Sequence, residues 1–177
     1  SRVADILLSF PETERLAVIG HSRLGKTALW CGAQDERIDF VFSNDSGCSG
    51  AAYERIKHGE SETIARITTV FPYWFCENYK KFAQCPDTRP FDQHMLLALS
   101  APRFLGVGSA SLDDWADQYS EQLSCVFAGD VWEKIYNKPG FVGSSGSVHY
   151  HLRDGIHFLG RADWNAYMAF VKSKIFS

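Results

Sequence analysis

The length of the chain, 177 residues, suits one folded domain, and its composition, 45% hydrophobic and 14% aromatic, excludes an intrinsically disordered protein. The formal net charge of −3 gives no electrostatic footprint for nucleic acid, and no basic cluster favours an anionic membrane surface. No apolar stretch approaches the roughly 18 residues that span a membrane. From the charge and this absence together, we expect neither a nucleic-acid partner nor a membrane partner.

The predicted elements alternate between strands and helices along the chain. The first dozen residues contain a helix-like run, VADILLSF, which Pro11 ends. Apolar spacing indicates two further helices, at 23–34 and 161–176. Four apolar, β-rich runs are RLAVIG at 15–20, IDFVFSN at 38–44, RFLGVGSA at 103–110 and SVHYHL at 147–152. Near-continuous apolar strands between helices predict an α/β fold with a mostly parallel sheet covered on both faces.

The strand expected at 15–20 has no earlier strand in this sequence to pair with. A sheet of the four runs would therefore leave an exposed edge. The chain contains no repeat, low-complexity tract or domain linker. We therefore expect residues 1–177 to form one partial domain, the C-terminal half of a larger α/β domain.

A serine lies between the strand-like and helix-like runs in GHSRLGK, residues 20–26. A nucleophile elbow has this layout, because a strand that ends abruptly before a helix exposes the serine hydroxyl on a strained turn. Gly20 and Gly25 lack a Cβ at two places where one would crowd the turn. The spacing is G-x-S-x-x-G, one residue longer than the usual elbow, and a helix N-cap is the alternative role for Ser22.

The same segment, extended to GHSRLGKT, also matches the phosphate-binding loop G-x-x-x-x-G-K-[ST]. Such a loop needs a carboxylate after another strand to hold magnesium, and Asp45 is a candidate for it. The direction of the Ser22 side chain separates the alternatives. It faces a cleft with a histidine in an esterase, whereas a nucleotide-binding protein presents an empty anion nest.

GHSRLGK resembles the G-x-S-R-x-G-K element of the glucuronoyl esterases, carbohydrate esterase family 15. Further segments agree in order with bacterial members: SNDSGCSGAA (43–52), FPYWF (71–75), PFDQHMLLALSAPR (90–103), SASLDDWAD (109–117) and HLRDGIHFLGRADW (151–164). The resemblance covers nearly the whole chain but only the second half of the family's domain. It implies an α/β-hydrolase-like three-layer sandwich and a serine esterase without a cofactor. The implied substrate is a glucuronoxylan or lignin-carbohydrate ester, and the implied location is secreted or periplasmic.

A serine hydroxyl needs a histidine as its base and an acid to orient that histidine. In α/β-hydrolases the base follows the serine and the acid, in a loop after the last strand. We predict His157, which comes after the turn signal Asp154-Gly155 and before the final helix. His149 and His151 share one face of the last strand, where structural roles are usual. The resemblance also places GIH on the catalytic histidine.

Two aspartates are candidates for the acid. Asp113 follows the third strand-like run, the usual position in other α/β-hydrolases. Asp45 follows the second run, where the resembling family commonly has glutamate, and its side chain is one methylene shorter. The alternatives are an Asx turn for Asp45 and a helix N-cap for Asp113, ahead of DWADQYSEQL. We place Asp113 slightly ahead of Asp45.

Donors are also required where negative charge develops on the ester oxygen. The backbone amide of Arg23 follows the nucleophile, and its guanidinium carries a permanent charge. The resemblance implies that this arginine stabilises the oxyanion, while a surface salt bridge is the alternative.

Substrate contacts are carried over by the resemblance, onto Lys26, Glu60 and Trp115. Charged groups suit ring hydroxyls and an indole offers a flat apolar wall. The alternatives are solvated surface charges for the first two and a core position for Trp115, as for Trp74.

The chain contains no HExxH, and HYH at 149–151 lacks a third ligand at a diagnostic spacing, so we expect no metal. The five cysteines contain no CxxC pair, and we expect most of them to be buried thiols.

Two other functions remain as alternatives to a glucuronoyl esterase. One is another carbohydrate or acyl esterase, and the other is an inactive carbohydrate-binding remnant.

Overall fold

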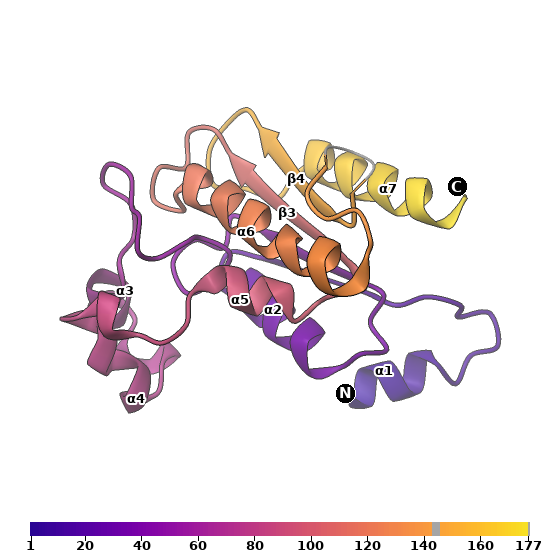
Figure 1. The fold of residues 1–177 in the computed structure, drawn as a ribbon, viewed down its shortest axis with the longest axis horizontal. Coiled ribbons are helices and arrows are strands. Elements are labelled where there is room, and N and C mark those ends of the chain that lie inside the picture. The colour runs from indigo at the N-terminus through magenta and orange to yellow at the C-terminus, as the bar shows by residue number, and fades with distance from the viewer. Residues whose placement is uncertain (143–145, 177) are drawn as a thin grey trace.

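A parallel four-stranded sheet forms the centre of the computed structural model, which describes residues 1–142 and 146–176 (Figure 1). The strands lie in the order β1 (Ala17–His21), β2 (Phe40–Asn44), β3 (Phe104–Ala110) and β4 (Val148–Arg153). One register row joins His21, Asn44, Gly108 and His151. The carboxyl ends of all four strands therefore meet at one edge, where the connecting loops carry polar side chains.

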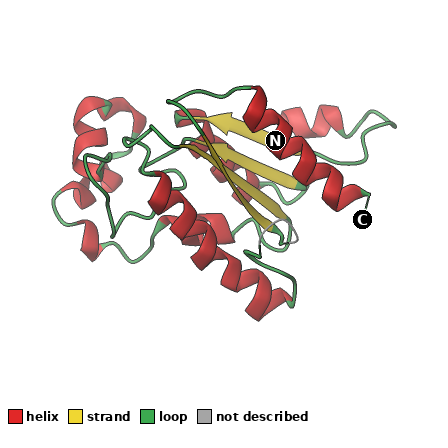
Figure 2. Cartoon of the chain, turned by 90° about the horizontal axis from the view of Figure 1, so that it is seen from above, coloured by secondary structure: helices red, strands yellow, loops and turns green. Residues whose placement is uncertain are grey.

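Helices cover both faces of this sheet, as the sequence predicted (Figure 2). One face packs against α2 (Arg23–Gln34), α5 (Gln93–Ala98) and α6 (Gln118–Tyr136) through a core that includes Leu29, Leu97 and Trp132. The other face packs against α7 (Arg161–Ile175), with Phe40, Phe42, Tyr167 and Phe170 in contact. Side chains that alternate along β2 therefore enter two separate cores.

A small helical lobe separates β2 from β3 beside the carboxyl edge of the sheet (Figure 1). Its elements are α3 (Ile64–Val70), η1 (Pro72–Trp74), α4 (Glu77–Lys80), η2 (Lys81–Ala83) and η3 (Pro86–Thr88), where η marks a short 3-10 helix. Cys48, Ile64 and Ile67 form its core, against which Phe71 and Trp74 pack. The lobe thereby places aromatic rings next to the strand ends.

The termini of the elements show where the sequence pattern was imprecise. The first helix is α1 (Arg2–Leu7), which ends before Pro11. The cap of α6 is Asp117, which accepts a hydrogen bond from the Ser120 N–H, so the helix starts four residues later than an Asp113 cap requires. Within the described residues, β1 pairs on one side only.

All five cysteines lie in the described part of the chain and are free, but only Cys48 and Cys125 are buried. Cys76 and Cys85 are exposed on the thin helical lobe, which has too little interior to cover them. The expectation that most of the thiols are buried is therefore wrong. No helix in the two described ranges is long and apolar enough to cross a membrane.

Candidate active site

Ser22 occupies the turn between β1 and α2 with φ 57° and ψ −128°, a backbone conformation that residues other than glycine rarely adopt. Its N–H donates to the carbonyl of Asn44 at 2.8 Å, which ties the turn to β2. A Cβ at Gly20 would lie 1.9 Å from the carbonyl oxygen of Leu24, so the strand and helix meet here only because residue 20 is glycine. Among the described residues, the Ser22 side chain makes no hydrogen bond to the helix that it precedes.

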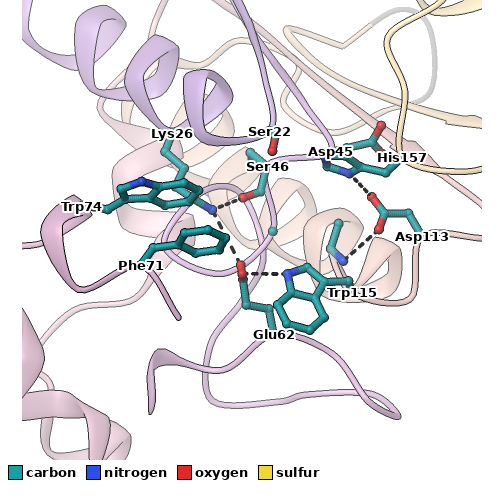
Figure 3. Close-up of a pocket in the computed structure, with 12 residues that line it drawn as sticks. Ser22, Lys26, Asp45, Ser46, Glu62, Phe71, Trp74, Asp113, Trp115 and His157 are labelled. Carbon is teal, nitrogen blue, oxygen red and sulfur yellow. Dashed lines mark hydrogen bonds and ion pairs between the residues drawn. The ribbon is translucent and has the colours of Figure 1, made fainter. Parts of the chain in front are cut away.

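The serine instead lines a cavity of about 310 Å³ at the carboxyl edge of the sheet (Figure 3). The cavity combines ionisable groups from several loops with aromatic walls from the lobe. Its side chains include Ser22, Lys26, Asp45, Glu62, Phe71, Trp74, Asp113, Trp115 and His157. Residues from every loop that follows a strand therefore converge on one space.

His157 and Asp113 form the closest ionisable pair of this cavity. The imidazole Nδ1 lies 2.6 Å from Asp113 Oδ2, and the Asp113 side chain is only 5% exposed (Figure 3). This hydrogen bond raises the pKa of His157. With Nδ1 engaged, Nε2 is the nitrogen left to face the cavity that Ser22 also lines.

Asp45, the other candidate acid, lies in a different environment. Its buried carboxylate accepts a hydrogen bond from the Asn44 amide at 2.8 Å, and the Arg153 guanidinium lies 3.6 Å away. Burial, followed by the negative charge of Asp113, raises the pKa of Asp45 to about 7. Of the two candidate acids, Asp113 is therefore the one that accepts a hydrogen bond from the His157 imidazole.

One set of side chains has the composition of a metal site. Ligand atoms of His21, Asp45 and His157 all lie within 4.8 Å of one another. However, the Asn44 amide nitrogen lies 2.8 Å from Asp45 and 3.3 Å from His21, and the Arg153 cation faces the same carboxylate. A hydrogen-bond donor and a positive charge at these atoms oppose a metal cation. The arrangement favours a hydrogen-bonded network over a metal site.

Lys26, Glu62 and Trp115 form the polar wall of the cavity opposite His157 (Figure 3). The indole Nε1 donates to Glu62 at 2.7 Å, and the Lys26 ammonium lies 3.8 Å from the same carboxylate. Burial lowers the pKa of Lys26 and raises that of Glu62. The guanidinium carbon of Arg66 lies 4.1 Å from the Trp115 ring centroid and holds the indole from behind.

Glu60, which the resemblance assigned to substrate binding, lies outside this cavity. It is exposed, and its carbonyl accepts a hydrogen bond from Arg66. The acidic residue on the cavity wall is Glu62, two positions later in the same loop. Sequence reasoning missed it because HGESET has no periodic pattern to show which glutamate points inward.

The backbone of Arg23 lies where the resemblance implied, but its guanidinium does not. Its backbone amide follows Ser22, but its guanidinium lies 5.8 Å from the Trp74 ring centroid and borders a neighbouring hollow with Trp30 and Phe75. Trp74 stacks on Phe71, with ring centroids 3.9 Å apart, and both rings line the serine cavity. Trp74 is thus a cavity wall as well as part of the lobe core.

The phosphate-loop interpretation does not fit these contacts. Lys26 donates to the main-chain carbonyls of Ser46 and Cys48, and the Thr27 hydroxyl donates to the carbonyl of Arg23. The lysine and threonine that a nucleotide and its magnesium ion require are thus engaged by the protein itself.

A protein-family profile described as "Glucuronyl esterase, fungi" matches residues 1–137. Carbohydrate esterase MZ0003, of an unknown prokaryotic organism, is 43% identical over 167 residues, which cover 89% of this chain and 38% of that protein.

Solved structures of glucuronoyl esterases are also similar to this chain. The glucuronoyl esterase from Solibacter usitatus aligns with a TM-score of 0.89 and 41% identity, covering 98% of this chain and 46% of that one. A serine-to-alanine mutant of the glucuronoyl esterase from Sporotrichum thermophile, in complex with methyl 4-O-methyl-β-D-glucopyranuronate, aligns with a TM-score of 0.74 and 27% identity, covering 93% and 44%. The chain spans less than half the length of each of these proteins.

Proposed function

The chain belongs to the glucuronoyl esterases, carbohydrate esterase family 15, and we propose that the complete protein hydrolyses esters of glucuronic acid or its 4-O-methyl ether. The ester alcohol that we propose is lignin-derived, with the uronic acid carried by xylan. The observation that carries this proposal is the 2.6 Å pair of His157 and Asp113 at a cavity that the strained Ser22 turn also lines.

We propose a two-step acyl transfer. Ser22 Oγ attacks the ester carbonyl while its proton passes to His157 Nε2, and the alcohol then leaves with that proton. Water attacks the resulting acyl-serine, His157 takes a proton from the water, and the free glucuronate departs as the proton returns to Ser22. Asp113 orients the imidazole and stabilises its charged form.

The negative charge of the tetrahedral intermediate requires donors close to Ser22. The backbone N–H of Arg23 has the position of the usual oxyanion donor after a nucleophile elbow. The guanidinium of the same residue lies beside Trp74, and we propose that the long side chain turns toward the oxyanion when substrate binds. We therefore assign the first donor to the backbone and the second to the side chain in the substrate complex.

The polar wall supports a sugar as the acyl group. Glu62 offers a charged acceptor to ring hydroxyls and Trp115 gives a flat surface for the ring, while the Lys26 ammonium, held by the Ser46 and Cys48 carbonyls, adds a positive charge beside them. The Sporotrichum relative was solved with a methyl glucuronate, an ester of the same chemical class. A plant cell-wall polymer cannot enter a cell, so we propose that the protein acts in secreted or periplasmic form.

Ser22→Ala in the full-length gene product tests the proposal. We expect hydrolysis of a methyl glucuronate ester to fall by about 10⁴-fold or more, and a fluorophosphonate probe to label only the unmodified protein. An acetylated xylan oligosaccharide serves as the competing substrate. Preferential acetate release would indicate a different carbohydrate esterase, and absence of labelling of a folded protein would indicate a binding module without catalysis.

A further inference from the structure

Arg153, the last residue of β4, gathers the loop that carries His157. Its guanidinium donates to the carbonyls of Asp154 at 3.1 Å and Ile156 at 3.0 Å, and also to the carbonyl of Phe158. Two of these carbonyls belong to the residues immediately before and after His157. One planar cation therefore holds the main chain on both sides of the imidazole.

The same guanidinium also donates hydrogen bonds to a buried carboxylate. Its Nε lies 3.1 and 2.9 Å from the two oxygens of Asp163, which is 0% exposed in the first turn of α7. Asp163 also accepts a hydrogen bond from the N–H of Gly160 at 2.7 Å. The anchor therefore joins the end of β4, the loop and the start of α7 into one unit.

The imidazole depends on such a support because little else encloses it. The His157 side chain is 43% exposed. Its ring lies beside Asp113 and beside His21, whose ring centroid is 4.5 Å away, and a carboxylate oxygen of Asp45 lies within 4.8 Å of one of its nitrogens. Gly155, with φ 122°, turns the chain just before it and is tied to the loop after β3 through Ser111 and Leu112, so the main chain around His157 itself is left to Arg153. Proton transfer requires the ring to stay within hydrogen-bond reach of both Ser22 and Asp113.

We propose that Arg153 is a positioning residue of the esterase reaction, which holds His157 in register with Asp113 and Ser22 by fixing the carbonyls on both sides of it. The inference rests on the proposed function. Arg153 does not touch the reacting atoms; it acts through the loop. Its planar fork of donors suits this task, because a lysine ammonium supplies a charge but cannot span three carbonyls and a carboxylate together.

Arg153→Lys in the full-length gene product tests the inference, because it retains a cation for Asp163. Arg103→Lys is a matched control. Arg103 also donates to three carbonyls, those of Asp35, Ile38 and Leu99 at 3.2, 3.0 and 3.0 Å, but it lies just before β3, at the opposite end of the strands from Ser22. Both substitutions remove comparable structural hydrogen bonds, and only one of them touches the His157 loop.

We expect Arg153→Lys to lower kcat for a glucuronate ester by about 10- to 100-fold while KM changes by less than about twofold. We also expect the downfield proton resonance of the His157–Asp113 hydrogen bond to broaden or disappear. Arg103→Lys should retain both kcat and the resonance, even if its melting temperature falls as far. Unchanged kcat and resonance in Arg153→Lys, or equal losses in the control, would overturn the inference.

Two further measurements keep the test decisive. If Arg153→Lys does not fold, the triple variant Arg153→Met, Asp163→Asn and Asp45→Asn removes the cation together with the two buried carboxylates that face it, with Asp45→Asn alone as its reference, and the same outcomes apply. The rate at which a fluorophosphonate labels Ser22 reports on the triad without any sugar ester. Normal labelling with no glucuronate hydrolysis would count against the proposed substrate only, whereas equal labelling rates in the wild type and Arg153→Lys would count against the positioning role.

Discussion

Two carboxyl groups lie near one imidazole, and their surroundings give them different roles. Asp113 makes the 2.6 Å hydrogen bond to His157, whereas burial raises the pKa of Asp45 to about 7. A carboxyl group with a pKa of about 7 exchanges its proton near neutral pH and cannot serve as a constant anionic partner. We therefore assign the orienting acid to Asp113 and expect Asp45 to tolerate loss of its charge.

Asp113→Asn should reduce kcat/KM for a glucuronate ester by about 10³- to 10⁴-fold, because an amide in this place favours the wrong imidazole tautomer. Asp45→Asn should reduce it by less than about tenfold. The hydrogen bond that His157 donates to Asp113 raises the pKa of His157, and the base must be unprotonated. The acidic limb of the pH–rate profile should therefore move to lower pH in Asp113→Asn. Steady-state kinetics across pH measures both effects. A larger loss in Asp45→Asn would reverse the assignment.

The glutamate pair of the HGESET loop offers a second comparison of single side chains. Glu62 lines the cavity and accepts the Trp115 hydrogen bond, whereas Glu60 is exposed outside it. Glu62→Gln keeps an acceptor for the indole but replaces a charged hydrogen bond to the sugar by a neutral one, so KM should rise by about tenfold or more. Glu60→Gln should leave KM unchanged. Equal effects of the two changes on KM would show that the loop changes conformation when the substrate binds.

At the scale of elements, α6 stabilises the turn after β2 through a single buried acid. The Glu121 carboxylate accepts hydrogen bonds from the N–H groups of Ser46 and Gly47, both at 2.9 Å, and from the Ser109 hydroxyl. Ser46 and Gly47 line the serine cavity. The floor of the site therefore depends on how α6 packs against β2 and β3.

Burial raises the pKa of Glu121 from 4.5 to about 7, which makes folding stability depend on pH. Between these two values the unfolded chain has released a proton that the folded chain keeps. The free energy of unfolding should therefore fall as pH rises through this window, by up to about 3 kcal/mol. Glu121→Gln should flatten this dependence in urea denaturation between pH 5 and 7.5. The exposed Glu133 of the same helix is the control, and Glu133→Gln should retain the wild-type slope.

The sequence was sufficient for the elements with a strong pattern and insufficient for short or competing ones. The strands β2 and β3 could be predicted because their residues are buried on both faces and so form unbroken apolar runs. The start of α6 could not, because Asp113 and Asp117 are both competent caps and the partner of Asp113 lies in a loop after β4. The lobe between β2 and β3 consists of helices too short to show a period.

The candidate site divides in the same way. Chain order and the strand-to-helix turn were enough to predict that Ser22 and His157 lie at one cavity, because topology alone brings the carboxyl ends of parallel strands together. The direction of a long side chain is a tertiary property that no local pattern contains. For this reason the sequence could not show that the Arg23 guanidinium lies beside Trp74, or that Glu62 rather than Glu60 lines the cavity.

At the scale of the whole molecule, exposed apolar side chains lie on α1, α2 and α5 as well as on other helices, and among the described residues β1 pairs with a strand on one side only. The ribbon in Figure 1 shows where these elements lie. Leu24 and Trp30 on α2 are each 57% exposed, and Leu99 just after α5 is 55% exposed. A flat strand edge beside apolar side chains is a template for association with another chain. The unpaired side of β1 and the apolar side chains of α2 are thus a candidate surface for association between copies of the chain.

We expect the 177-residue chain, produced alone, to bind the dye ANS and to sediment as a concentration-dependent mixture, because burial of this surface between copies is favourable at roughly 25 cal/mol per Å². Replacing Leu24 and Trp30 together by glutamine should weaken both signals. Tyr73→Gln is the control, since Tyr73 is 79% exposed but lies on the separate lobe, and it should change neither signal. A chain that stays monomeric on dilution and binds no dye would show that this surface is compatible with an independent domain, and the α2 face would then need another explanation.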